Sequence, residues 1–168
     1  EITDLELSED AVPTWTKLTE EYSSGYLTVP VVGAGTANTE CEVLTGMSTK
    51  LFGPGEYPYQ TRLMDRTVES VAYDLKENGY ATHAIHNHRA AFYNRNDVYA
   101  NLGFDDFTSI EYMPKAERTP KNWAKDSILT DQIIKALDVT EDQADLVFTV
   151  SVQGHGKYPT EQVLEDPA

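Results

Sequence analysis

Apolar and polar positions along the chain follow two spacings, which predict alternating helices and strands. Five segments have the apolar period, cap residues or composition of helices: residues 8–22, 37–44, 67–78, 94–102 and 126–137. Three runs of apolar and β-branched residues are typical of strands: residues 25–32, 80–86 and 145–152. We therefore expect an α/β fold, with a parallel or mixed sheet flanked by helices on both faces.

Some of these predictions depend on particular signals. Ser8 is the expected N-cap of the first helix, and Gly79 is the expected end of the helix over 67–78. The run 145–152, DLVFTVSV, is almost continuously apolar, which is typical of a strand covered on both faces. Residues 48–64 are rich in Gly, Pro and Tyr, which predicts an ordered loop that buries its aromatic rings.

Three loops are the expected place for a ligand. In sheets of this kind the ligand lies beyond the carboxyl ends of the strands. The loops that follow the three predicted strands are residues 33–36, 86–95 and 153–158. We expect them to meet at one end of the sheet.

Composition and charge narrow the class of protein. The chain has 168 residues, of which 40% are hydrophobic, enough for one domain with a buried core. Lys and Arg number 13 against 28 Asp and Glu, so the formal charge of −15 repels phosphate backbones and argues against a nucleic-acid partner. The single cysteine, Cys41, excludes an internal disulfide framework, and no apolar run approaches the roughly 20 residues of a membrane span.

Thr36 is the first candidate for chemistry. It follows Gly33, Ala34 and Gly35 and stands at the start of a predicted helix, where backbone N–H groups and the helix dipole favour an anion. A divalent cation would stabilise its alkoxide as a nucleophile. The alternative is that Thr36 only caps the helix.

The second loop concentrates positive and titratable residues in an acidic chain. They lie within thirteen positions: His83, His86, His88, Arg89 and Arg95. Arginine offers paired donors to a phosphate, and histidine offers donors or metal ligation. We expect His86 and Arg95 to be functional, and His83 to pack beside the strand. In the third loop His155 stands between two glycines, and we expect it to lie at the same end of the sheet.

Four stretches carry a family resemblance: GYLTVPVVGAGTANTECEVLTGMS, FGPGEYPYQ, ENGYATHAIHNHRAAFYNRNDVYANLGFDDF and FTVSVQGHGKYP. In this order they resemble the extracellular catalytic domain of the lipoteichoic acid synthase and phosphoglycerol transferase family, in the sulfatase and alkaline phosphatase superfamily. The most specific signal is GTANTE followed by EVLTG. Cys41 does not fit the C/S-x-P-x-R motif of sulfatases, so we expect it to be a small buried residue.

The resemblance implies that Thr36 is the nucleophile and a ligand of a manganese-type ion. It would attack the phosphodiester of phosphatidylglycerol, release diacylglycerol and pass glycerol phosphate to a cell-envelope polymer or glycan. The enzyme would act on the extracellular face of a bacterial membrane, anchored by transmembrane helices that lie outside this chain.

The resemblance also implies a substrate-binding set. His86 and His155 match histidines of the glycerol phosphate pocket, and Arg95 matches the phosphate-binding arginine. Tyr93 stands where a Trp is common, and His88 where some relatives have an acid.

The family's other metal ligands are expected outside this chain: a carboxylate upstream of residue 1 and an Asp-His pair downstream of residue 168. We therefore expect residues 1–168 to be one partial catalytic domain, to bind manganese poorly and to be inactive alone. Its open sheet edges would favour self-association.

Two alternatives remain open at the level of the sequence. One is a phosphodiesterase, phosphatase or other hydrolase of the same superfamily, which would hand the group to water. The other is a noncatalytic module that binds an anion or a glycan.

Overall fold

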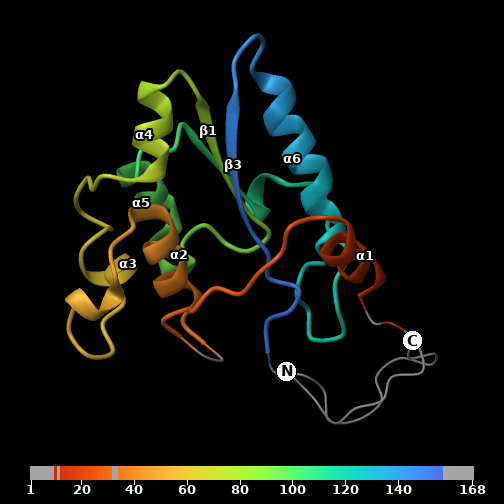
Figure 1. The fold of residues 1–168 in the computed structure, drawn as a ribbon, viewed down its shortest axis with the longest axis horizontal. Helices are drawn as coiled ribbons and strands as arrows, with labels where there is room; N and C mark the ends of the chain where they lie inside the picture. Colours follow the sequence, from red (N-terminus) through yellow and green to blue (C-terminus); the bar gives the residue numbers. More distant parts are fainter. Residues whose placement is uncertain (1–9, 11, 32–33, 157–168) are drawn as a thin grey trace.

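A three-stranded parallel sheet forms the centre of the molecule. The computed structural model describes residues 10, 12–31 and 34–156. The strands, β1 (Ala81–His86), β2 (Asp106–Ser109) and β3 (Asp145–Val150), lie in the order β2-β1-β3 (Figure 1). His86 at the end of β1 pairs with Ser109 on one side and with Val150 on the other. The central strand β1 is buried along its whole length because it has a neighbour on each side.

Helices cover both faces of this sheet. The helices are α1 (Pro13–Glu21), α2 (Thr36–Thr45), α3 (Pro58–Thr61), α4 (Val71–Glu77), α5 (Arg95–Asn101) and α6 (Ser127–Val139), with short 3₁₀ turns at Thr49–Leu51, Phe92–Asn94 and Ile110–Tyr112. Figure 1 shows α2, α4 and α5 on one side of the strands and α6 on the other. The predicted α/β architecture is therefore confirmed, and the sheet is parallel over the described residues.

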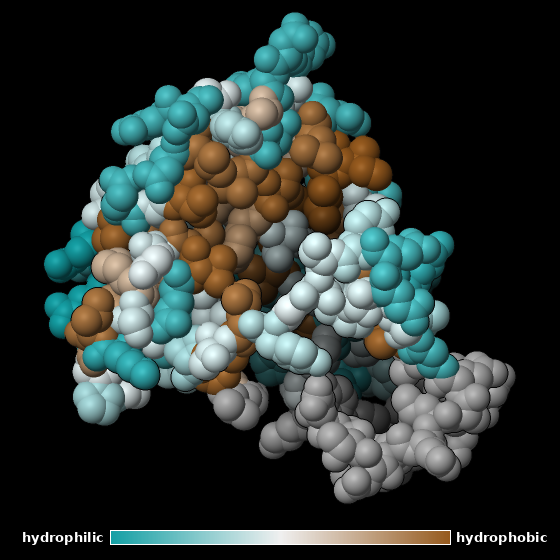
Figure 2. Space-filling model, in the orientation of Figure 1, coloured by the Kyte–Doolittle hydropathy of each residue, from teal (hydrophilic) through white to brown (hydrophobic). Residues whose placement is uncertain are grey.

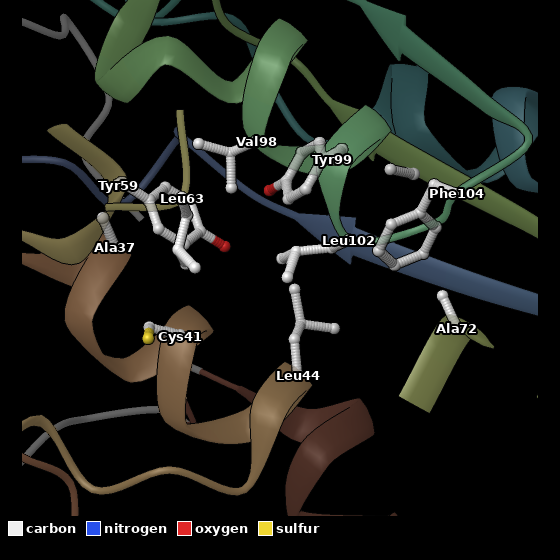
Figure 3. Packing of buried hydrophobic residues seen from close by; sticks show 11 residues of the cluster. Ala37, Cys41, Leu44, Tyr59, Leu63, Ala72, Val98, Tyr99, Leu102 and Phe104 are labelled. Atoms are coloured by element: carbon white, nitrogen blue, oxygen red, sulfur yellow. The ribbon is translucent and has the colours of Figure 1, made fainter. Parts of the chain in front are cut away.

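The main core lies between the sheet and the helices α2, α4 and α5. Its members are buried apolar side chains of these elements and of the segment around α3, several of which converge in Figure 3. Tyr99 of α5 is fully buried, and its ring meets Phe104, Phe107 and Phe148 edge to face at 4.9–6.1 Å. Tyr59 is also fully buried, as expected for the aromatic-rich loop over 48–64.

The prediction of a strand over residues 25–32 is wrong for the residues that the structure describes. Residues 25–31 form neither helix nor strand, and Tyr26 and Leu27 are 95% and 88% exposed. A β-prone sequence becomes a strand only where it pairs with a sheet and buries one face. This segment does neither, and Pro30 removes one of the N–H groups that a ladder would need.

The strand β3 also differs from the expectation. It is an edge strand in which every residue is only part-buried, not a strand covered on both faces. Figure 2 shows apolar side chains gathered over the region where β3 lies in Figure 1. The apolar run therefore reflects a surface that the described residues do not cover.

Helix starts differ from the prediction in two places. The helix α4 begins at Val71, because the Ser70 hydroxyl caps it by accepting from the N–H groups of Ala72 and Tyr73. The predicted cap Ser8 lies outside the described residues, and α1 begins at Pro13. Within the described part of the chain, no helix has both the length and the apolar character that a bilayer crossing requires.

Candidate active site at the carboxyl ends of the strands

A cavity of about 610 Å³ opens where β1 and β3 end. Loops 33–36, 86–95 and 153–158 all contribute described residues to its wall, as do Val31, Thr39 and the end of β3. Five of the six predicted site residues line it: Thr36, His86, Tyr93, Arg95 and His155. The sixth, His88, lines a neighbouring groove, although its ring lies only 5.9 Å from that of His86.

Thr36 is the first residue of α2, with its side chain exposed to the cavity. The N-cap position belongs to Gly35, so the structure does not support the interpretation of Thr36 as a cap. Gly35 has φ +86°, which L side chains rarely adopt, and a Cβ there would meet Tyr57 and Val31 at 3.3 Å. Glycine is thus needed to turn the chain directly before the Thr36 hydroxyl.

Arg95 is held by a buried carboxylate that sequence reasoning missed. Its Nε donates to Glu40 Oε2 at 3.1 Å, its Nη2 donates to Glu40 Oε1, and its Nη1 donates to the Phe92 carbonyl at 3.1 Å. Tyr99 also donates its hydroxyl to Glu40, at 2.9 Å. Arg95 and Glu40 are 2% and 4% exposed, so this is a desolvated ion pair.

The pair decides what Arg95 can offer a ligand. Burial lowers the pKa of Arg95, but the hydrogen bonds and charge of Glu40 outweigh it and raise that pKa above its ordinary value. A guanidinium has five N–H donors: Glu40 and Phe92 accept from three, and the other two have no partner among the described residues, while Arg95 lines the cavity. A ligand therefore meets oriented donors of a neutralised pair rather than a free positive charge.

Tyr93 owes its position to an unusual backbone. Tyr93 and Asn94 both have positive φ, at 59° and 55°, immediately before α5 begins at Arg95. The Tyr93 ring stacks on Tyr57 at 5.6 Å and lies 5.4 Å from the Arg95 guanidinium carbon. Two consecutive left-handed residues cost energy, and such strain is typical of functional sites.

His86 is a buried, neutral imidazole. Its Nδ1 lies 2.7 Å from the Val150 carbonyl, which can only accept, so Nδ1 carries the proton and Nε2 is left as an acceptor. Burial, with a further contribution from the positive charge of Arg95, lowers the pKa of His86 to about 4. At neutral pH this residue accepts a hydrogen bond from a hydroxyl and adds no charge to an anion site.

The other histidines differ sharply from His86. His155 is exposed and packs on Trp123 at 4.4 Å, with Nδ1 2.5 Å from the Gly156 carbonyl. His83 points to the opposite face of β1 and lies between Asp106 (2.7 Å) and Asp145 (3.2 Å). It joins the three strands, in line with the expected packing role.

The described residues do not fit a complete metal site. No group of three His, Cys, Asp or Glu side chains is placed among them to hold an ion. Thr36 could give one oxygen, whereas Glu40 is committed to Arg95, and the Nδ1 of His86 is committed to Val150. A hard divalent ion prefers several carboxylate or carbonyl oxygens.

Cys41 is fully buried in the core, as expected, and burial raises the pKa of its thiol.

Comparison with known proteins identifies the class to which this fold and site belong. The chain belongs to the sulfatase family, which matches residues 1–167. A protein of Rhizobium meliloti (strain 1021) described as "Putative cyclic beta-1,2-glucan modification protein" is 37% identical over 154 residues. The match covers 92% of this chain and 23% of that relative, so the chain spans less than a quarter of the relative's length.

Solved structures with a similar fold include a member of the alkaline phosphatase superfamily. The lipoteichoic acid synthase LtaP of Listeria monocytogenes is 26% identical, with a TM-score of 0.63 over 76% of this chain and 30% of LtaP. The phosphoglycerol transferase GacH of Streptococcus pyogenes, solved with sn-glycerol-1-phosphate, is 20% identical, with a TM-score of 0.73 over 90% of this chain and 40% of GacH. A Vibrio parahaemolyticus protein of the superfamily has a TM-score of 0.56, at 20% identity over 79% of this chain and 32% of its own. The predicted resemblance to phosphoglycerol transferases of this superfamily is thereby confirmed.

Proposed function

We propose that residues 1–168 carry the nucleophile and substrate pocket of a phosphoglycerol transferase, as part of a larger sulfatase-like catalytic domain. The enzyme moves glycerol phosphate from a phosphatidylglycerol-type lipid to a glycan through a phosphothreonine at Thr36. The observation that carries this proposal is the cavity that joins the Thr36 hydroxyl, at the start of a ten-residue helix, to the free donors of Arg95 and the acceptor nitrogen of His86.

The reaction has two displacements at phosphorus. In the first, Thr36 Oγ forms a bond to phosphorus, the bond to the diacylglycerol oxygen breaks, and diacylglycerol leaves with the proton that Thr36 loses. In the second, an acceptor hydroxyl attacks, the Thr36 bond breaks, and Thr36 recovers a proton. The N-terminal end of α2 favours the negative charge that both steps build near Oγ.

The rest of the cavity suits a glycerol phosphate headgroup. The two free N–H donors of Arg95 would hold phosphate oxygens. The Nε2 of His86 would accept from a glycerol hydroxyl, because its neutral form has a lone pair there. Tyr93 would cover the carbon skeleton, with its ring already fixed by Tyr57.

A glycan is the acceptor that the comparisons favour. The Rhizobium meliloti relative is described as a cyclic β-1,2-glucan modification protein, and GacH was solved with sn-glycerol-1-phosphate. We infer that this enzyme acts outside the cell on a lipid donor, with a manganese-type ion bound by Thr36 and by ligands beyond this chain. Transfer to water, as in a phosphodiesterase, is the competing outcome.

The test uses the protein encoded by the full reading frame that contains this chain. It is incubated with manganese, phosphatidylglycerol labelled in the headgroup, and a β-1,2-glucan. We expect label on the glucan, none with Thr36→Ala, and normal transfer with the matched control Thr45→Ala at the other end of α2. Label released only as free glycerol phosphate would favour a hydrolase. Undiminished transfer by Thr36→Ala would refute the proposal.

A further inference from the structure

A second concave site lies beside the candidate active site. This groove of about 290 Å³ is lined by Asn87, His88, Arg89, Ile110, Arg118, Lys121, Asn122 and Trp123. Trp123 forms the wall between the two sites, because its ring meets His155 of the first cavity at 4.4 Å and His88 of the groove at 5.6 Å. A ligand in the groove would thus lie next to the reaction centre.

The groove carries concentrated positive charge in an acidic protein. Arg89, Arg118 and Lys121 line it, and its lining includes no carboxylate among the residues that the structure describes. The chain as a whole has a formal charge of −15. Within the described part of the chain, the side chains of Arg89 and Lys121 make no hydrogen bond or ion pair, and Arg118 donates only to the Asn122 carbonyl. Unpaired cations that converge on one hollow are the arrangement that binds an anion.

Two of the three cations, Arg118 and Lys121, lie on a turn that is held by its own hydrogen bonds. Arg118 and Ala124 form an antiparallel bridge, and Thr119 and Trp123 bond through both backbone and side chain at 2.8–3.1 Å. Asn122, in the left-handed region at φ 69°, accepts from Arg118 at 2.8 Å. Three acids lie near the groove without lining it: Glu111 accepts from the Ala90 N–H, Asp126 accepts from the Asn87 amide, and Glu117 pairs with Lys125.

We propose that this groove binds a phosphate ester of a sugar or polyol on the acceptor side of the reaction. The phosphate contacts Arg89, Arg118 and Lys121, and the carbon skeleton lies toward Trp123. This inference rests on the proposed function, because it takes the ligand to be an acceptor that already carries a phosphoglycerol group. A glucan so modified would bind more tightly than an unmodified one.

Binding to the groove can be measured by isothermal titration calorimetry on the protein encoded by the full reading frame that contains this chain. The titrants are inorganic phosphate, sn-glycerol-1-phosphate, a neutral β-1,2-glucan oligosaccharide and the same oligosaccharide bearing phosphoglycerol. We expect the last to bind most tightly and the neutral sugar at least tenfold more weakly, with binding that weakens as salt rises.

The test variant is Arg118→Gln with Lys121→Gln. It should weaken binding of the modified oligosaccharide at least tenfold. The matched control, Lys50→Gln with Lys135→Gln, removes the same charge at two exposed lysines outside the groove and should change binding less than twofold. If loss of the Arg118 bond unfolds the turn, Lys121→Gln alone serves, because its side chain has no partner to lose; we expect about a threefold loss.

Several outcomes would overturn the groove assignment. They are equal weakening in both double variants, equal affinity for the neutral and the modified sugar, and binding only to anionic or zwitterionic lipid vesicles. The proposed function fails separately. If the wild-type protein binds the modified oligosaccharide at the groove but transfers no phosphoglycerol through Thr36, the proposed transferase function is wrong. If it transfers phosphoglycerol but binds nothing at the groove, only this inference is wrong.

Discussion

The buried pair of Glu40 and Arg95 makes the sharpest prediction on stability. The substitution Glu40→Gln keeps the size of the side chain and one carbonyl oxygen, but it removes the negative charge. Arg95 would then be a cation at 2% exposure, with Phe92 O and a weaker amide partner in place of a carboxylate. The hydroxyl of Tyr99 would lose its charged acceptor as well.

The magnitude follows from the cost of an uncompensated buried charge. Removal of one partner of a buried ion pair destabilises a protein by about 3–5 kcal/mol. A domain of this size has a total stability of about 5–15 kcal/mol and a urea m-value of about 2 kcal/mol/M, so the urea midpoint should fall by about 2 M.

Urea unfolding followed by circular dichroism measures this shift. The matched control is Glu77→Gln, the same chemical change at an exposed residue at the end of α4. The double variant Glu40→Leu with Arg95→Met removes both charges and should recover part of the loss. A midpoint for Glu40→Gln within about 0.2 M of the control would refute the account of a desolvated pair.

Three further predictions follow from the same structure. Burial lowers the pKa of His86 from 6.5 to about 4, so between these pH values the unfolded chain binds a proton that the folded chain does not. Between pH 7 and 4 the free energy of unfolding of the wild type should therefore fall by about 3 kcal/mol more than that of His86→Gln. Parallel curves of stability against pH would contradict this. Gly35→Ala should lower stability by about 1–2 kcal/mol in thermal unfolding, while the control Gly25→Ala, which has open space around it, should not. The open apolar side of β3 predicts self-association that rises with concentration in light scattering, and a constant monomer mass would count against it.

Elements with local signals could be predicted from the sequence. The helix α6 and the strand β1 were expected within a few residues of their observed bounds, because apolar spacing, glycines and caps are encoded locally. The strand over 25–32 and the full covering of β3 could not be predicted correctly. Both depend on which distant segment pairs with them, and sequence pattern contains no such information.

The candidate site also combines residues that could be predicted from the sequence with residues that could not. The meeting of the loops that carry His86 and His155 followed from fold topology, because each comes directly after a strand. Thr36 lines the same cavity, although the strand expected before its loop does not form. The partner of Arg95 was missed, although a signal existed: Glu40 falls on the buried face of α2 with Ala37, Cys41 and Leu44, where a charge is unexpected. The placement of His88 in the neighbouring groove depends on a bend of the loop that no spacing records.

The central claim is that Thr36 carries the phosphoglycerol group between donor and acceptor. The most direct measurement is mass spectrometry of the protein encoded by the full reading frame, after incubation with manganese and phosphatidylglycerol and without acceptor. Trypsin would release residues 18–50 as one peptide, and fragmentation would locate the added group. We expect one phosphoglycerol group on Thr36, which disappears when glucan is added. Turnover with no adduct, or an adduct on another residue, would contradict it.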